Sequence, residues 1–185
     1  MRAAVFIDNS NIFRCINTMR EAGEKQWPNF YDPLFLAHRL AGNRELVYVG
    51  FYCVSPPYYL MQGNENDQYR YTTTQKYYTE IAKQDLVEVK YGDLKYSQDS
   101  KKREPHEKNV DTQLVSDLLG KAAFNEYDVA IIAANDGDYV SGIEWAKKLG
   151  RKIEVMFFKG FLSDNLRKIA ITRRARPSFF KRLNF

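Results

Sequence analysis

Histidine and cysteine, the residues that most often bind zinc or form disulfides, are scarce in this chain, which has two of each among 185 residues. Cys15 and Cys53 lack metal-ligand spacing and are too few for a disulfide framework. We therefore expect both to be small core residues in a reducing compartment. His38 lies in an expected helix and His106 in a highly charged stretch, so both are expected to be ordinary surface residues.

Long hydrophobic runs, repeats and low-complexity tracts are absent as well. No segment approaches the ~20 apolar residues needed to span a bilayer. Asp8 and Asn9 interrupt the first apolar run, so it does not have the pattern of a signal peptide. The length and the hydrophobic share of 44% are those of one globular domain with its own core. We expect a soluble, cytoplasmic protein with no membrane partner.

Positively charged residues outnumber negatively charged ones. The chain has 28 Lys and Arg residues against 23 Asp and Glu residues, a formal net charge of +5. This balance favours a polyanionic partner such as nucleic acid, although it does not indicate a fold.

Two apolar runs each end on an aspartate. Residues 3–7 lead into Asp8, and residues 129–135 lead into Asp136. Both runs are too continuously apolar to alternate between core and water, so they are typical of strands buried on both faces of a parallel sheet. Ligands of open α/β sheets bind beyond the carboxyl ends of the strands. The two aspartates therefore indicate a metal site there.

The rest of the chain alternates between strand and helix patterns, which implies βαβ units and one doubly wound α/β domain with a mainly parallel sheet. Residues 95–108 are rich in charge and lack apolar periodicity, so we expect an exposed, mobile loop. Strands are expected at about 3–8, 45–54, 86–91, 128–136 and 152–158, and helices after 9–11, from 32–33 to 42, at 70–84, at 110–124, from about 140 to 150, and briefly after Ser163.

Asp111 and Asp138 extend the acidic set. Asp111 falls near the middle of an apolar stripe in the first turn of its helix, where a carboxylate toward a core is costly unless paired or metal-bound. The alternative is a helix-start aspartate favoured by the macrodipole. Asp138 follows Asp136 after Gly137 and is equally compatible with a site residue or a helix N-cap. Asp117, rotated about 120° from Asp111, is expected to be a supporting or solvated residue.

Four converging carboxylates would repel one another strongly. Two unit charges 4 Å apart repel by about 4 kcal/mol at an effective dielectric of 20. Protonation or a bound cation must relieve this repulsion, and oxygen ligands select Mg²⁺ or Mn²⁺ over zinc. Such an ion suits phosphoryl chemistry, because it can activate water and stabilise the leaving oxygen.

Three segments carry a family resemblance: residues 6–11, residues 108–111 with Asp117, and residues 135–139. In order and spacing they resemble the three signatures of NYN domains, the LabA-like branch of the PIN-like nucleases, over about residues 3–158. The chain departs from the usual Ser-Gly before Asp-Gly-Asp, having Ala134-Asn135 instead, so Asn135 would have to replace a hydroxyl. It also departs in its basic end, which leaves the family's C-terminal packing without a counterpart.

The resemblance implies a three-layer α/β/α PIN-like fold over residues 1–160, followed at 161–185 by a helix and a basic aromatic tail. It implies an RNA-cleaving Mg²⁺ or Mn²⁺ site. By position, Asp8 and Asp136 would be metal ligands, Asp111 the helix-borne acid, and Asp138 a second ligand or water-positioning group. Asn11 would orient carboxylates or a phosphate. PIN-like domains often pair, so a homodimer is a further expectation.

Basic residues mark the expected RNA contacts, because Lys and Arg neutralise phosphates and interleaved aromatic rings can stack on unpaired bases. The alternative for the phenylalanines of the tail is that they pack back on the domain. The candidate contacts are Arg167, Lys168, Arg173, Arg174, Arg176, Lys101, Lys102 and Arg103.

These observations favour a metal-dependent ribonuclease acting on single-stranded or structured RNA. An RNA-binding or regulatory module with a weak or inactive acidic site is the alternative. A phosphatase that forms a phospho-aspartate on Asp8 is a distant third, because such enzymes usually have a second aspartate where this chain has Ser10.

Overall fold

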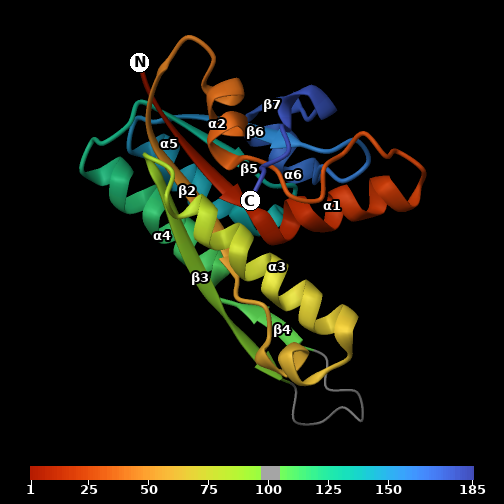
Figure 1. Cartoon of the computed structure of the whole chain (residues 1–185). Helices are drawn as coiled ribbons and strands as arrows, with labels where there is room; N and C mark the ends of the chain where they lie inside the picture. Colours follow the sequence, from red (N-terminus) through yellow and green to blue (C-terminus); the bar gives the residue numbers. More distant parts are fainter. Residues whose placement is uncertain (97–104) are drawn as a thin grey trace.

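The computed structural model describes residues 1–96 and 105–185, which form a central sheet covered by helices on both faces (Figure 1). The sheet order is β4-β3-β2-β1-β5-β6-β7, with all neighbours parallel except β4, which pairs antiparallel with β3. The strands are β1 (Arg2–Asp8), β2 (Glu45–Val54), β3 (Val87–Tyr96), β4 (Pro105–Lys108), β5 (Val129–Ala133), β6 (Lys152–Phe157) and β7 (Ile171–Arg174). The helices are α1 (Asn9–Glu21), α2 (Pro33–Ala41), α3 (Glu65–Ile81), α4 (Val110–Ala123), α5 (Val140–Lys148) and α6 (Asp164–Ile169), with short 3₁₀ turns η1 (Tyr58–Gln62), η2 (Gly137–Tyr139) and η3 (Pro177–Phe179).

Alternation along the central strand divides the core in two. Ala3, Val5 and Ile7 of β1 pack under α1, α2 and α3, whereas Ala4 and Phe6 pack under α4, α5 and α6. Because both faces of β1 are covered, its run is continuously apolar, as the sequence predicts. The expected α/β fold with a mainly parallel sheet is confirmed.

The strand order places a topological switch point at β1. From β1 the chain proceeds outward through β2 and β3, then returns to pair β5 on the other side of β1, with Ile7 opposite Ala133. The carboxyl ends of β1 and β5 therefore meet where doubly wound sheets bind ligands.

The expected loop at 95–108 is wrong at both ends. β3 continues to Tyr96, and Pro105–Lys108 form β4 opposite it, with Tyr96 paired with Pro105. A two-stranded ribbon at a sheet edge is held together by backbone hydrogen bonds, so its sequence does not need an apolar periodicity that would predict it. Proline fits at the first position of an edge strand. Lys101, Lys102 and Arg103 lie outside the described residues.

Two further boundaries differ from the sequence expectation. Helix α3 begins at Glu65 rather than near 70, because Asn64 caps it by accepting the Asp67 N–H at 3.1 Å. The chain after α6 is not a simple tail, since β7 pairs with β6. Phe180 is buried, with its ring centroid 5.2 Å from that of Tyr31, which confirms the packed alternative for this phenylalanine.

Within the described parts of the chain, no helix is both long enough and apolar enough to cross a membrane.

Candidate metal centre at the carboxyl edge of the sheet

Asp8 ends β1 and caps the helix that follows. Its Oδ1 accepts the Asn11 N–H at 3.0 Å, so the carboxylate occupies the N-cap of α1. Its Oδ2 accepts the hydroxyl of Tyr139 at 2.8 Å. With only 4% of its surface exposed, Asp8 is one of the buried polar residues in the described part of the chain.

Tyr139 joins two of the expected acids. The same hydroxyl that donates to Asp8 lies 2.5 Å from Oδ1 of Asp111, in the first turn of α4. Burial, followed by the negative charge of Asp8, raises the pKa of Tyr139 far above its usual value, so the hydroxyl keeps its proton. One hydroxyl has one hydrogen but faces two carboxylate oxygens. The hydroxyl therefore bridges the two carboxylates and brings their negative charges close together.

Asp111 reaches this position from the surface. The residue as a whole is exposed while Val110 and Leu114 of the same helix are buried. Its carboxylate nevertheless faces the buried hydroxyl of Tyr139, so the expected pairing of this carboxylate is present. Side chains tilt toward the N-terminus of a helix, so a first-turn residue can project past the helix end instead of into the core.

Asp136 and Asp138 lie on the other side of the switch point. Asp136 is partly buried and caps η2, its Oδ1 accepting the Asp138 N–H at 3.2 Å. The capping aspartate is thus Asp136 and not Asp138, which is exposed in the first turn. The extended backbone of Asp136, with φ −79° and ψ 136°, gives it the N-cap geometry.

A buried amide network holds the two strand ends together. The Oδ1 of Asn11 accepts both the Asn135 N–H at 3.1 Å and the Asn135 Nδ2 amide at 2.6 Å. Asn135 in turn accepts the Phe158 N–H at 2.7 Å and donates to Cys15 Sγ at 3.2 Å. Asn135 therefore connects α1, β5 and the end of β6 through one side chain. Burial raises the pKa of the Cys15 thiol to about 12, so it remains protonated.

A hollow of about 300 Å³ opens beside Asp136, lined also by Arg14, Ser163 and Asn11. Arg14 was not among the residues expected from the sequence, although it follows Asn11 by three residues and so lies on the same face of its helix. Ser163 places a hydroxyl next to Gly137, the residue between Asp136 and Asp138. Its Oγ would lie 3.0 Å from a Cβ added at Gly137. It does not make a side-chain capping bond to α6.

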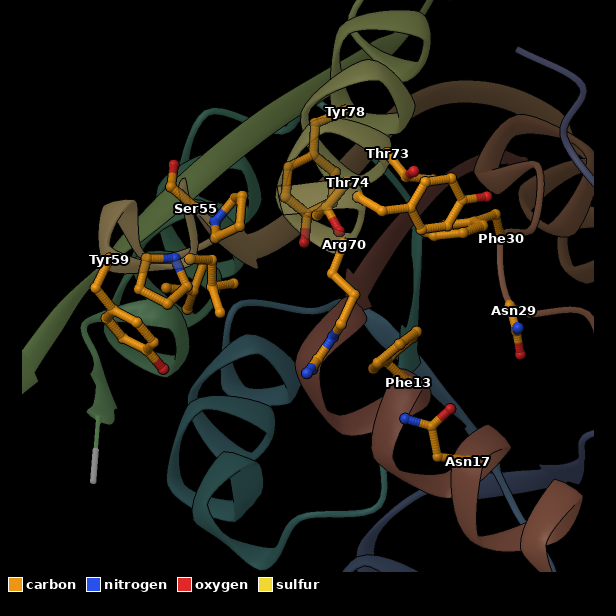
Figure 2. A pocket seen from close by; sticks show the side chains of 15 residues that line it. Phe13, Asn17, Asn29, Phe30, Ser55, Tyr59, Arg70, Thr73, Thr74 and Tyr78 are labelled. Carbon is orange, nitrogen blue, oxygen red and sulfur yellow. The ribbon is translucent and has the colours of Figure 1, made fainter. Parts of the chain in front are cut away.

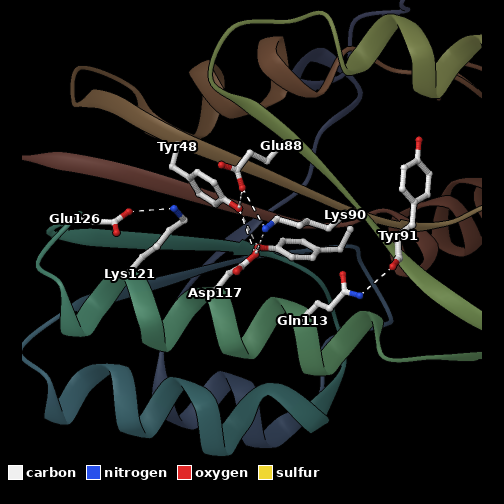
Figure 3. Close-up of polar contacts among 9 residues, drawn as sticks. Tyr48, Glu88, Lys90, Tyr91, Gln113, Asp117, Lys121 and Glu126 are labelled. Carbon is white, nitrogen blue, oxygen red and sulfur yellow. Dashed lines mark hydrogen bonds and ion pairs between the residues drawn. The ribbon is translucent and has the colours of Figure 1, made fainter.

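Asp117 belongs to a different cluster, between α4 and the strands β2 and β3 (Figure 3). Its Oδ2 accepts the Tyr52 hydroxyl at 2.8 Å and lies 3.5 Å from Nζ of Lys90. Burial lowers the pKa of Lys90, while Asp117 and Glu88 raise it, and the net shift is upward. Asp117 therefore has protein partners beneath the sheet and is not simply a solvated surface residue.

The basic residues of the C-terminal segment are not equivalent. Arg167, Lys168, Arg174 and Arg176 are exposed. Arg173 instead donates to the carbonyl of Leu40 at 3.1 Å and lies 3.6 Å from Glu154, which also binds Arg44. Its guanidinium therefore ties β7 to the neighbouring helix and strand, and its expected contact with RNA stays a prediction.

The donor chemistry of the acidic edge fits a hard cation. Asp8, Asp111, Asp136 and Asp138 offer oxygen only, which suits Mg²⁺ or Mn²⁺. The structure brings Asp8 and Asp111 to one hydroxyl and places Asp136 and Asp138 at the neighbouring strand end. No group of three histidine, cysteine, aspartate or glutamate side chains is arranged as a metal-binding set within residues 1–96 and 105–185.

This sheet order with acids at the switch point defines a PIN-like α/β domain. The family model of the NYN domain matches residues 2–173, so the chain belongs to the NYN domain family, whose members are associated with nuclease activity in general. It is similar in fold to the crystal structure of a protein of unknown function from Vibrio parahaemolyticus, with a TM-score of 0.64 and 18% identity over 97% of this chain and 96% of that one. No curated protein matches the sequence.

Proposed function

We propose that the protein is a ribonuclease that depends on Mg²⁺ or Mn²⁺. The observation that supports this most is the Tyr139 hydroxyl, which faces the carboxylates of Asp8 and Asp111 with a single hydrogen. A divalent cation there would offset the repulsion between these two neighbouring carboxylates. The order of the three sequence motifs supports a place in the LabA-like branch of the family.

In this proposal Asp8 and Asp111 hold the ion, and Asp136 and Asp138 complete its surroundings directly or through water. When bound, the ion activates a water molecule and polarises the scissile phosphate. Asn11 and Asn135 position Asp136, because the hydrogen bonds between their amide groups connect the ends of β1 and β5. Arg14, beside Asp136, supplies a positive charge for a phosphate of the RNA.

An RNA-binding module without cleavage is the second candidate, favoured by a specific observation. Among the described residues, no three potential ligands stand together as a formed metal-binding set. A site that never assembles would leave the basic surface as the functional part of the molecule.

The experiment is cleavage of fluorescent single-stranded and hairpin RNAs in Mg²⁺, Mn²⁺ or EDTA, with Asp136→Asn as the test variant. Asparagine keeps the Oδ1 that accepts the Asp138 N–H, so η2 remains capped while the charge is lost. We expect cleavage in either metal, none in EDTA, and a loss of roughly 100-fold or more in the variant, the scale of losing a key electrostatic group.

Asp164→Asn is the matched control, because it removes an exposed carboxylate from the first turn of α6. Its cleavage rate should stay within about twofold of the parent, as is usual for a surface substitution. Full activity of Asp136→Asn would overturn the proposed site. Tight RNA binding by the parent protein without cleavage in either metal would establish the binding module instead.

A further inference from the structure

A second hollow, of about 560 Å³, begins at the carboxyl end of β2 and runs between α1, η1 and α3 (Figure 2). Exposed aromatic rings line it from three elements: Phe13 of α1 is 39% exposed, Tyr59 of η1 is 50% exposed and Tyr69 of α3 is 70% exposed. Aromatic rings with this much exposed surface contribute little to packing of the core.

The hollow continues along α3. Phe30, Tyr69 and Thr73 also line an adjoining cavity of about 320 Å³, whose other walls include Lys76 and Arg182. The two cavities share these three residues and lie next to each other along α3, and we name them together the α3 groove. Its length along the helix suits a chain molecule better than a compact ligand.

The charged side chains that line the α3 groove are all positive. Arg70 lies in the first cavity, and Lys76 and Arg182 lie in the second, while no Asp or Glu side chain among the described residues lines either one. Arg70 is exposed and extends from α3 toward Phe13 (Figure 2). Within the part of the chain that the structure describes, its guanidinium has no hydrogen bond or ion pair with another residue. This arrangement complements an anionic backbone.

The α3 groove adjoins the acidic edge. Helix α1, which supplies Phe13, begins directly after Asp8, and Tyr52 of β2 pairs with Asp8 two residues before Val54 enters the groove wall. An RNA strand with one phosphate at Asp8 would therefore enter the α3 groove on one side of that phosphate.

We propose that the α3 groove binds an unpaired segment of RNA, with bases stacked on Tyr69, Tyr59 or Phe13 and phosphates neutralised by Arg70 and Lys76. The proposal rests on RNA as the substrate of the acidic site and adds its form: single-stranded beside the cleaved bond. Paired bases present no free face to the aromatic rings, whereas unpaired bases do. A duplex would lose this stacking.

Binding in EDTA tests the groove without cleavage. The probe is a fluorescein-labelled oligouridine of about 12 nucleotides, within the site sizes of single-strand binders, compared with a duplex of equal length. Arg70→Gln should weaken single-strand binding several-fold and lower the slope of log K against log salt by about 0.7 for each phosphate that the variant no longer neutralises. Tyr69→Ala should weaken it at least about fivefold, the effect of removing the ring on which one base stacks.

Both residues are exposed, so the variants should fold, which circular dichroism can check. Arg39→Gln is the matched control, since this arginine is exposed on α2, outside the groove, over the ring of Phe35. It should bind like the parent. Unchanged single-strand affinity in Arg70→Gln and Tyr69→Ala, or equal losses for the duplex, would overturn the groove. Binding that depends on the groove in a protein that never cleaves would instead refute the ribonuclease proposal alone.

Discussion

At the scale of residues, the acidic edge depends on hydroxyl and amide groups as much as on carboxylates. Tyr139 comes from η2, yet it contacts the acids of β1 and α4. Asn135 connects α1, the end of β5 and the end of β6 through hydrogen bonds of its amide. Tyr139 thus holds two negative charges near each other, and neither neutral side chain adds to the repulsion.

Tyr139→Phe should therefore disable the site while leaving the fold in place. The phenylalanine fills the same volume but no longer connects Asp8 to Asp111, so the two carboxylates lose their common orientation. We expect a loss of about 10- to 100-fold in metal affinity or cleavage rate, the usual effect of removing a group that orients ligands. Mn²⁺ titration by calorimetry and single-turnover cleavage measure it.

Tyr127→Phe is the control for this variant. Tyr127 is equally buried on the same face of the sheet, but its hydroxyl donates to the Leu118 carbonyl at 2.8 Å, away from the acids. It should lower stability by about 1 kcal/mol and leave metal affinity unchanged. Equal metal affinity in the two variants would show that the Tyr139 bridge does not organise the site.

At the scale of elements, strand β2 is shaped by a glycine. The Tyr52 ring folds back over Gly50, and a Cβ on Gly50 would lie 2.5 Å from the Tyr52 hydroxyl oxygen. This close approach lets Tyr52 lie 3.3 Å from the Tyr48 hydroxyl and bind Asp117 of α4. The absence of a side chain at one position thus joins β2 to the helix below it (Figure 3).

Gly50→Ala should displace the Tyr52 ring and break its bond to Asp117. Crowding a packed core costs about 1–3 kcal/mol, and we expect a loss of this size in the free energy of unfolding. Denaturation in guanidinium measures the change. Gly120→Ala provides the contrast, because a Cβ there meets nothing within 4 Å and the residue lies within the last turn of α4. This substitution should stabilise the protein by about 0.5–1 kcal/mol. Equal effects of the two substitutions would refute the contact argument.

At the scale of the whole molecule, several tyrosines are buried in the core. Burial raises the pKa of Tyr31, Tyr52, Tyr77 and Tyr127 above the ordinary value of 10.0. Two of them are linked in series, since the Tyr77 hydroxyl donates to the Tyr31 carbonyl at 2.7 Å. The folded state therefore retains protons that the unfolded chain releases in alkali.

The stability of the protein should consequently fall above pH 10. Below that pH both states keep these protons, and the contribution is fully present. Above it only the unfolded state ionises, so each such tyrosine removes about 1.4 kcal/mol per pH unit until its folded pKa is reached. Urea unfolding between pH 8 and pH 11, with tyrosinate absorbance as a second signal, measures the effect. A free energy of unfolding that stays constant over this range would contradict it.

The local patterns of the sequence were sufficient for the central architecture. The apolar runs of β1, β2, β5 and β6 predict buried parallel strands, and the structure confirms strands there, because burial on both faces requires such runs whatever the neighbours are. The edge strands β4 and β7 were missed. Their pairing is made by backbone groups that every residue has, so the charged and basic segments that form them carry no distinguishing pattern.

For the site, the sequence alone determined which acids stand at the carboxyl ends of strands and that their oxygen donors suit a hard cation. Only the tertiary structure decided which acids meet. The contacts of Asp8 with Tyr139 and of Asn11 with Asn135 join residues more than a hundred positions apart. Strand order and side-chain direction create these contacts, and neither can be obtained from local periodicity. The same holds for the α3 groove, whose rings come from three separate elements and share no motif.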